Sequence, residues 1–193
     1  MDDAVFIIPA GFESPKAEVY LQIMAAFKAK GIKPCPVNIV WKRTTLTENL
    51  NQFLKQFEKS KVKGFYLFGF SFGAYLAFVA SAKITPKAQI LCSLSPYFKE
   101  DLSLLKNSWR KVIGKNRLED IQKNYSFDEL VKKVTCKTIL IAGDEEGDKL
   151  ERRVFDAYKK LSSQKELVVI KGAKHDIRQK EYLEKIKEVI ASL

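Results

Sequence analysis

The sequence predicts an α/β protein built on one doubly wound sheet of six parallel strands, with helices on both faces. Short apolar runs alternate with helix-length segments along the 193 residues, which is typical of consecutive β-α units. The breaks between these segments are short, and no linker or repeat divides the chain. A single domain over residues 1–193, with 46% hydrophobic residues, has enough of them to bury a large core.

The six expected strands are short and apolar, as strands buried on both faces of a parallel sheet are. They are expected at residues 4–9, 37–41, 64–70, 88–94, 138–142 and 167–170. Right-handed crossovers and a central third strand give the spatial order 2-1-3-4-5-6, with every pair parallel. The order reverses between strands one and three, and ligands of such sheets bind at the carboxyl ends of the strands there.

The helices between these strands are marked by their end signals. Ser14 and Pro15 predict the start of the first helix, because serine is a common N-cap and proline fits the first helical position. Gly31 ends this helix, and Pro34 and Pro36 break the chain before the second expected strand.

Capping boxes predict the start of two later helices. Thr45-x-x-Glu48 begins the second helix, and Ser126-x-x-Glu129 begins a short helix before the fifth strand. Further helices are expected at residues 74–80, 148–161 and 178–193.

Residues 95–135 interrupt the β-α alternation with a long, charged stretch that carries scattered aromatic residues. An insertion at this point stands above the rim of the sheet, and its apolar residues, such as Phe98, Leu105 and Trp109, need a surface to pack against. The stretch is therefore predicted to form a short helical cap over the rim. Its densest basic group is Lys106, Arg110, Lys111, Lys115 and Arg117. This group is either a solvated helix face or a means of attracting anionic substrates.

The segment Gly69-Phe70-Ser71-Phe72-Gly73 lies between an expected strand and an expected helix. A serine flanked by glycines at such a junction is the pattern of a nucleophile elbow. The sharp turn holds the serine in a strained backbone conformation, and side chains at the two glycine positions would collide with the strand or the helix. A plain Gly/Ser turn at a strand end is the alternative interpretation of the five residues.

Three further loops follow strand ends and meet the elbow at the same rim. Gly11 lies in the loop after strand one, residues 143–148 form an acidic loop after strand five, and His175 follows strand six. His175 is the only histidine in the sequence. A serine, an acid and a histidine in this order along the chain are typical of an esterase-type triad.

Through the elbow at Ser71, the loop at Gly11, the acidic loop at 143–148 and the loop at His175, the chain resembles the α/β-hydrolase superfamily over nearly its whole length. The resemblance implies a minimal version of that fold, because the family's first two strands have no counterpart here. The loop after strand one also reads Pro9-Ala10-Gly11 where many members have His-Gly.

The resemblance implies a serine hydrolase, a carboxylesterase or thioesterase that acts on small to medium acyl substrates without a metal or organic cofactor. By the same resemblance, Ser71 would carry the acyl group and His175 would act as general base. The backbone N–H groups of Phe12 and Phe72 would form the oxyanion hole.

The acid of the implied triad is one of several carboxylates in the loop after strand five. Glu146, three residues past Gly143, fits the register usual in relatives and is the preferred candidate. Asp148 is the alternative, although Asp148-x-x-Glu151 before a helix is also an N-cap signature. Asp144 is so close to the strand end that a role in bracing the loop is expected for it.

The composition leaves two other classes of protein open. With 34 Lys+Arg against 23 Asp+Glu the formal charge is +11, which would suit a basic module that binds nucleic acid or an anionic membrane. The basic residues are scattered through every segment, so a basic solvated surface is favoured and no nucleic acid partner is expected. A catalytically silent binding protein with the same triad order is the other alternative.

The sequence contains no clear signal for secretion, disulfide formation or membrane insertion. Three cysteines, Cys35, Cys92 and Cys136, indicate neither a disulfide framework nor a thiolate zinc site. The acidic start Met1-Asp2-Asp3 lacks the features of a signal peptide. The uncharged run 64–82 is split by glycines and predicts a buried strand and helix instead of a membrane span. A cytoplasmic location is therefore expected.

Overall fold

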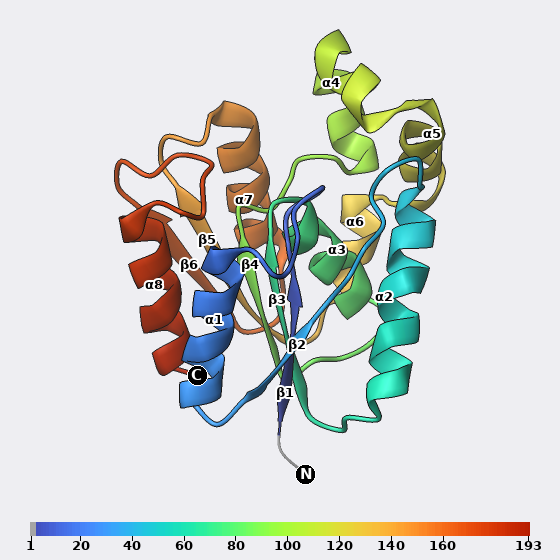
Figure 1. Ribbon diagram of the computed structural model, residues 1–193. Coiled ribbons are helices and arrows are strands. Elements are labelled where there is room, and N and C mark those ends of the chain that lie inside the picture. The colour runs from blue at the N-terminus through green and yellow to red at the C-terminus, as the bar shows by residue number, and fades with distance from the viewer. Residues whose placement is uncertain (1–2) are drawn as a thin grey trace.

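The computed structural model describes residues 3–193 and contains one sheet of six parallel strands between two helical layers (Figure 1). The strands are β1 (Ala4–Ile8), β2 (Lys33–Pro36), β3 (Phe65–Phe70), β4 (Ala88–Cys92), β5 (Lys137–Gly143) and β6 (Lys165–Ile170). They lie in the order β2-β1-β3-β4-β5-β6, and every neighbouring pair is parallel. The predicted strand order and direction are confirmed.

Helices cover both faces of the sheet, and each face has its own apolar core. The helices that form these layers are α1 (Glu18–Ala29) and α8 (Lys180–Ala191) on one face, and α2 (Leu46–Ser60), α3 (Phe72–Ser81) and α7 (Asp148–Lys160) on the other. Alternate residues of β1 point to opposite faces: Val5 and Ile7 pack under α1 and α8, while Phe6 and Ile8 pack under α2 and α3. This two-sided burial explains why the strands are apolar throughout.

The insertion after β4 folds into short helices at the carboxyl-end rim of the sheet, where α4 rises above the rest of the molecule (Figure 1). Its elements are η1 (Lys99–Leu104), α4 (Asn107–Ile113), α5 (Lys115–Asn124), α6 (Phe127–Leu130) and η2 (Val131–Lys133). Phe98 anchors the insertion, because its buried ring packs against the rings of Tyr75, Phe78 and Phe127 at centroid distances of 4.3, 5.5 and 5.2 Å. Trp109 on α4 remains half exposed.

The prediction of the second strand at residues 37–41 is wrong, because β2 lies one segment earlier and contains both prolines. The backbone N–H groups of Lys33 and Val37 donate to carbonyls in or beside β1, at 2.8 and 3.0 Å. Pro34 and Pro36 occupy alternate positions, whose N–H groups would point away from β1. Because β2 is an edge strand, the missing donors remove no bond from the sheet.

The N-caps predicted at Ser14 and at Asp148 are wrong, although α7 starts at Asp148 as expected. Ser14 is not the N-cap of α1; that position is Ala17, and Ser14 Oγ instead accepts the N–H of Lys16 at 3.1 Å in a separate turn. Asp148 is the first residue of α7 and Gly147 is its N-cap, so the Asp148 side chain makes no capping bond. An acidic side chain in the first turn still interacts favourably with the helix dipole.

The remaining element predictions agree with the structure. The other five strands start and end within two residues of their expected bounds. Thr45 and Glu48 form the predicted capping box of α2, and Ser126 accepts the N–H of Glu129 at the start of α6. Within residues 3–193 no helix has the length and apolar character of a membrane span. Met1 and Asp2, on which the signal-peptide prediction partly depends, lie outside the described residues.

Candidate active site

Ser71 lies at the junction of β3 and α3, in a backbone conformation with φ 55° and ψ −119°. A Cβ added at Gly69 would lie 2.4 Å from the carbonyl oxygen of Gly73, and one added at Gly73 would lie 2.1 Å from that of Ile8. Both positions therefore require glycine, as the elbow pattern predicts. The N–H of Ser71 donates to the carbonyl oxygen of Cys92 in β4 at 2.9 Å, which fixes the turn to the neighbouring strand.

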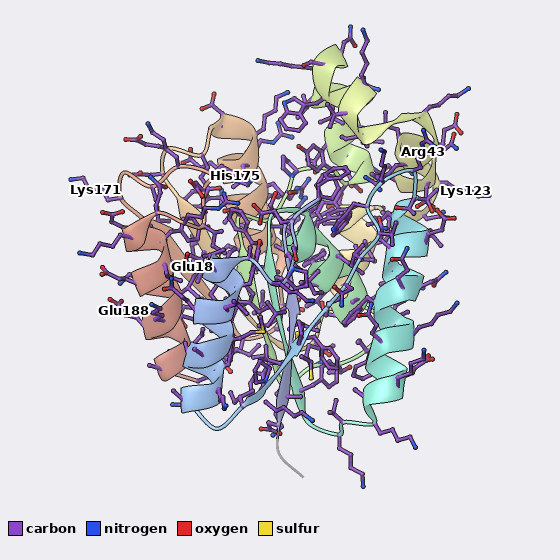
Figure 2. All side chains as sticks on the ribbon, in the orientation of Figure 1. Glu18, Arg43, Lys123, Lys171, His175 and Glu188 are labelled. Carbon is purple, nitrogen blue, oxygen red and sulfur yellow. The ribbon has the colours of Figure 1, made fainter. Side chains whose placement is uncertain are left out.

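His175 lies in the loop between β6 and α8, at the same rim of the sheet (Figure 2). Its Nε2 is 3.0 Å from Ser71 Oγ, and its Nδ1 is 2.8 Å from Glu146 Oε2. The imidazole stacks on the ring of Phe70, with centroids 5.1 Å apart. Serine, histidine and glutamate thus form one continuous hydrogen-bonded chain, with the imidazole held between two partners and an aromatic face.

Glu146 is held by more than the histidine, and its side chain is fully buried. Its Oε1 accepts the N–H of Gly143 at 2.6 Å and the hydroxyl of Ser93 at 2.9 Å. Ser93 has a positive φ of 53°, and its Oγ is 2.6 Å from the hydroxyl of Tyr182. Burial raises the pKa of Tyr182 well above its usual value, so this hydroxyl stays protonated.

Asp144 and Asp148, in the same loop, do not contact the histidine. Asp144 Oδ1 accepts the N–H of Gly172 at 2.6 Å and so braces the loop that precedes His175. Asp148 is exposed and makes no side-chain hydrogen bond within residues 3–193, although it lines the cavity described below. Of the two candidates for the acid, Glu146 is therefore the one that contacts His175.

The loop after β1 lies against the first turn of α3. A Cβ added at Gly11 would be 3.3 Å from Phe72 Cβ, so the two backbones approach closely. As the first residue of α3, Phe72 has an N–H without an intrahelical partner. Phe12 has a φ of 68°, and its N–H donates to no group within residues 3–193. The N–H groups of Phe12 and Phe72 are thus both available at this rim.

A polar network holds the loop after β1 in place. The N–H of Ala10 donates to the Tyr20 hydroxyl at 2.9 Å, and this hydroxyl donates to Glu13 at 2.6 Å. Glu13 also accepts a hydrogen bond from Arg178, at 2.6 Å, in the segment that follows His175. The network therefore connects the Phe12 loop to the histidine loop. Neither its members nor Ser93 and Tyr182 carry a local motif, and only proximity in the folded chain identifies them.

Ser71, His175 and Glu146 line a cavity of about 790 Å³. Most of its wall is apolar, and the aromatic residues that line it are Phe12, Phe70, Phe72, Tyr97 and Trp109. The rings of Phe72 and Tyr97 stack with centroids 4.8 Å apart. Ser95 Oγ, 3.3 Å from Ser71 Oγ, adds a second hydroxyl to the floor. Within residues 3–193, no cluster of three or more His, Cys, Asp or Glu side chains is arranged to hold a metal ion.

No known family model and no curated protein matches the sequence, but many solved structures have the same fold. Est1E from Butyrivibrio proteoclasticus has a TM-score of 0.84 at 16% identity, covering 99% of this chain and 88% of its own. Mouse alpha/beta hydrolase domain-containing protein 10 has a TM-score of 0.76 at 13% identity, with coverages of 98% and 88%. Dienelactone hydrolase from Anabaena variabilis has a TM-score of 0.72 at 16% identity, with coverages of 99% and 84%.

Proposed function

We propose that this chain, which has the α/β-hydrolase fold, is a serine hydrolase that cleaves carboxylic esters or thioesters through an acyl-Ser71 intermediate. The observation that carries the proposal is the hydrogen-bonded chain from Ser71 Oγ to His175 Nε2, at 3.0 Å, and from His175 Nδ1 to Glu146, at 2.8 Å. A nucleophile, a base and an orienting acid in this geometry are what acyl transfer to serine requires.

In the first step, Ser71 Oγ attacks the acyl carbon while His175 Nε2 accepts the hydroxyl proton. Glu146 holds the Nδ1–H tautomer and stabilises the imidazolium that forms. The tetrahedral intermediate collapses, the bond to the leaving oxygen or sulfur breaks, and His175 returns the proton to the leaving group. A water molecule, deprotonated by the same histidine, then attacks the acyl carbon and releases the acid and free Ser71.

The negative charge that develops on the acyl oxygen needs two donors. The N–H groups of Phe12 and Phe72 suit this role, because the loop after β1 approaches Phe72 closely and neither group has another partner in the part of the chain that the structure describes. Donors of this kind each lower the barrier by about 3 kcal/mol in measured hydrolases. The Ala10–Tyr20–Glu13 network would hold the Phe12 loop for this purpose.

The insertion at residues 95–135 would act as the cap over the acyl or leaving group. Tyr97, Leu105, Trp109 and Ile113 contribute apolar wall to the cavity that contains Ser71. The cavity volume of about 790 Å³ suits a small-molecule substrate. No cofactor is needed for the steps described.

A fluorophosphonate probe, which reacts with an activated serine, tests this proposal. We expect labelling of the wild type, no labelling of Ser71→Ala, and strongly reduced labelling of His175→Gln. Ser95→Ala is the matched control, because Ser95 Oγ is in the same cavity but is not the proposed nucleophile. This variant is expected to retain labelling.

Two outcomes would favour the alternative functions. A folded wild type that is neither labelled nor able to hydrolyse activated esters would indicate a catalytically silent binding protein. Absence of labelling together with salt-sensitive binding to polyanions would favour the basic module, because neutralised phosphates release counterions.

A further inference from the structure

Arg117, on α5, is a buried cation without an acidic partner. Only 4% of its surface is exposed, and no carboxylate within residues 3–193 lies within ion-pair distance of it. Buried arginines are normally paired. Arg153, which is equally buried, follows that rule with Asp101 at 2.6 Å and Asp156 at 2.9 Å. The uncompensated charge of Arg117 therefore calls for an explanation.

Neutral oxygens satisfy only part of the Arg117 guanidinium. Nε donates to the carbonyl of Thr44 at 2.9 Å, and Nη2 donates to the carbonyl of Trp41 at 2.5 Å and to Thr44 Oγ1 at 3.1 Å. Nη1 donates to no atom within residues 3–193. Nη1 is not one of the fully buried side-chain atoms that lack a partner in this part of the chain, which are Gln89 Oε1 and Ser163 Oγ. Since Nη1 has no partner there, it must therefore be in contact with open space. Arg117 thus presents an unused edge in a fixed position.

Arg117 is part of the wall of the proposed active-site cavity, which it lines together with Ser71 and His175. We infer that this cavity is the open space that Nη1 reaches. Its Cζ lies 6.0 Å from the ring centroid of Phe72, the residue that directly follows Ser71. Lys106 also lines this cavity, and residues 104–117 contain five cations and no acid.

The nearby carboxylates do not neutralise Arg117. Asp120, on the same helix, and Glu48, on α2, attract it without forming an ion pair, and burial lowers its pKa from the usual value. Asp120 is itself engaged by the N–H and hydroxyl of Thr47, at 2.8 and 2.7 Å. Arginine nevertheless stays protonated in proteins, so a positive charge remains at the cavity wall.

We propose that Arg117 binds an anionic group of the substrate, a carboxylate or phosphate, and so selects anionic esters or thioesters. The inference rests on the proposed function, because it assigns a substrate class to the same cavity. The planar guanidinium is suited to oxyanions, and its Nε and Nη2 bonds hold it in place before the ligand arrives. An anion at Nη1 would supply the missing partner of the buried charge.

Two pairs of esters test the assignment and locate the anionic group. The first pair is the para-nitrophenyl monoester of adipic acid against para-nitrophenyl hexanoate, which differ by a carboxylate at the end of the acyl chain. The second is the hexanoyl ester of para-hydroxybenzoate against that of para-hydroxybenzamide, which differ on the leaving-group side. Wild type is expected to prefer the anionic member of at least one pair in kcat/KM by about 10- to 100-fold, the usual effect of a hydrogen bond to a charged group.

Three variants separate the local site from other effects. Arg117→Gln is expected to remove most of the preference for the anionic ester, while kcat/KM for the neutral ester changes less than about threefold. Arg117→Lys is expected to keep part of the preference, because lysine retains the positive charge but not the planar guanidinium. Lys123→Gln removes the same charge from the same helix, where Lys123 points away from the molecule (Figure 2). It is expected to leave the preference unchanged.

Three results would overturn the proposal. The first is an equal loss of kcat/KM on anionic and neutral esters in Arg117→Gln, which would mean that Arg117 only holds α5 against residues 41–44. The second is a wild type with no preference for the anionic ester. The third is an equal change of that preference in Lys123→Gln and Arg117→Gln. If no ester is turned over, the proposed function fails, and the anion site is judged by thermal shift alone. Adipate and inorganic phosphate are each added; a Tm increase in wild type but not in Arg117→Gln supports the site, and no increase refutes it.

Discussion

Replacing Glu146 by glutamine changes one carboxylate oxygen into an amide group and tests the triad directly. In the structure Oε1 accepts from Gly143 N–H and Ser93 Oγ, at 2.6 and 2.9 Å, and Oε2 faces His175 Nδ1 at 2.8 Å. The amide oxygen of glutamine can keep the first two bonds. Its NH₂ group then faces Nδ1 and donates to it, so the imidazole proton moves to Nε2.

A proton on Nε2 points toward Ser71 Oγ, 3.0 Å away, and leaves no acceptor for the serine proton. The corresponding change in measured triads lowers kcat by about 10⁴-fold, or about 5.4 kcal/mol of barrier. The stability loss should be much smaller, because the side chain keeps its shape, two of its three hydrogen bonds are kept and the third is only reversed in direction. Exchanging charge-assisted bonds for neutral ones costs about 1 kcal/mol.

The assay compares kcat for para-nitrophenyl hexanoate with the free energy of unfolding in urea, for wild type and Glu146→Gln. Asp148→Asn is the matched control, because Asp148 lines the same cavity and its side chain makes no hydrogen bond to the residues that the structure describes. This control is expected to keep kcat within about threefold and to lose at most about 1 kcal/mol of helix-dipole stabilisation. Activity of Glu146→Gln within tenfold of wild type, or loss of activity in Asp148→Asn alone, would refute the assignment of Glu146.

Three further predictions concern stability. Ser71→Gly should be more stable than Ser71→Ala by about 1–3 kcal/mol in urea unfolding, because both lack the hydroxyl and only alanine keeps a Cβ at φ 55°; equal stabilities would exclude strain at the elbow. Gly73→Ala should lower the free energy of unfolding by more than about 3 kcal/mol, because the added Cβ would lie 2.1 Å from backbone. Gly31→Ala, with open space around it, should lower it by about 1–2 kcal/mol. Similar losses in the two variants would contradict the close approach at Gly73. Burial raises the pKa of Tyr125 to about 12, above its value in the unfolded chain. The contribution of this tyrosine to stability should therefore be complete below about pH 10 and lost as the pH rises through about 12. A Tyr125→Phe variant whose free energy of unfolding has the same pH dependence as that of the wild type would refute this.

The strand order was predictable because the apolar runs are continuous and the crossover rule leaves few alternatives. The position of β2 was not, since Pro34 and Pro36 are normally strand breakers. Only the assembled sheet shows that β2 is an edge strand and that both prolines occupy positions with no bond to make. A pattern-based prediction therefore moved the strand to the next apolar run, residues 37–41.

The candidate site was predictable where it depends on local motifs. The elbow at Ser71 and the lone His175 in its loop are local signals, and the structure brings them within hydrogen-bonding distance. The carboxylate that meets the histidine depends on a turn of a few residues, and the sequence left Glu146 and Asp148 as alternatives. Ser93 anchors Glu146 from a different strand end, so no spacing along the chain could reveal it.

The residues proposed for catalysis lie beside strained backbone held by the sheet, whereas the residue proposed for substrate selection lies in the insertion. Three of the five non-glycine residues with positive φ within residues 3–193 are Phe12, Ser71 and Ser93, in loops at the carboxyl ends of the adjacent strands β1, β3 and β4. Such conformations cost about 1–3 kcal/mol each and persist only where surrounding structure fixes them, so the sheet holds these three before any substrate binds. Arg117, by contrast, belongs to the insertion and depends on its contacts with the loop before α2. Substitutions in the insertion are therefore expected to change the preference among esters before they change labelling of Ser71.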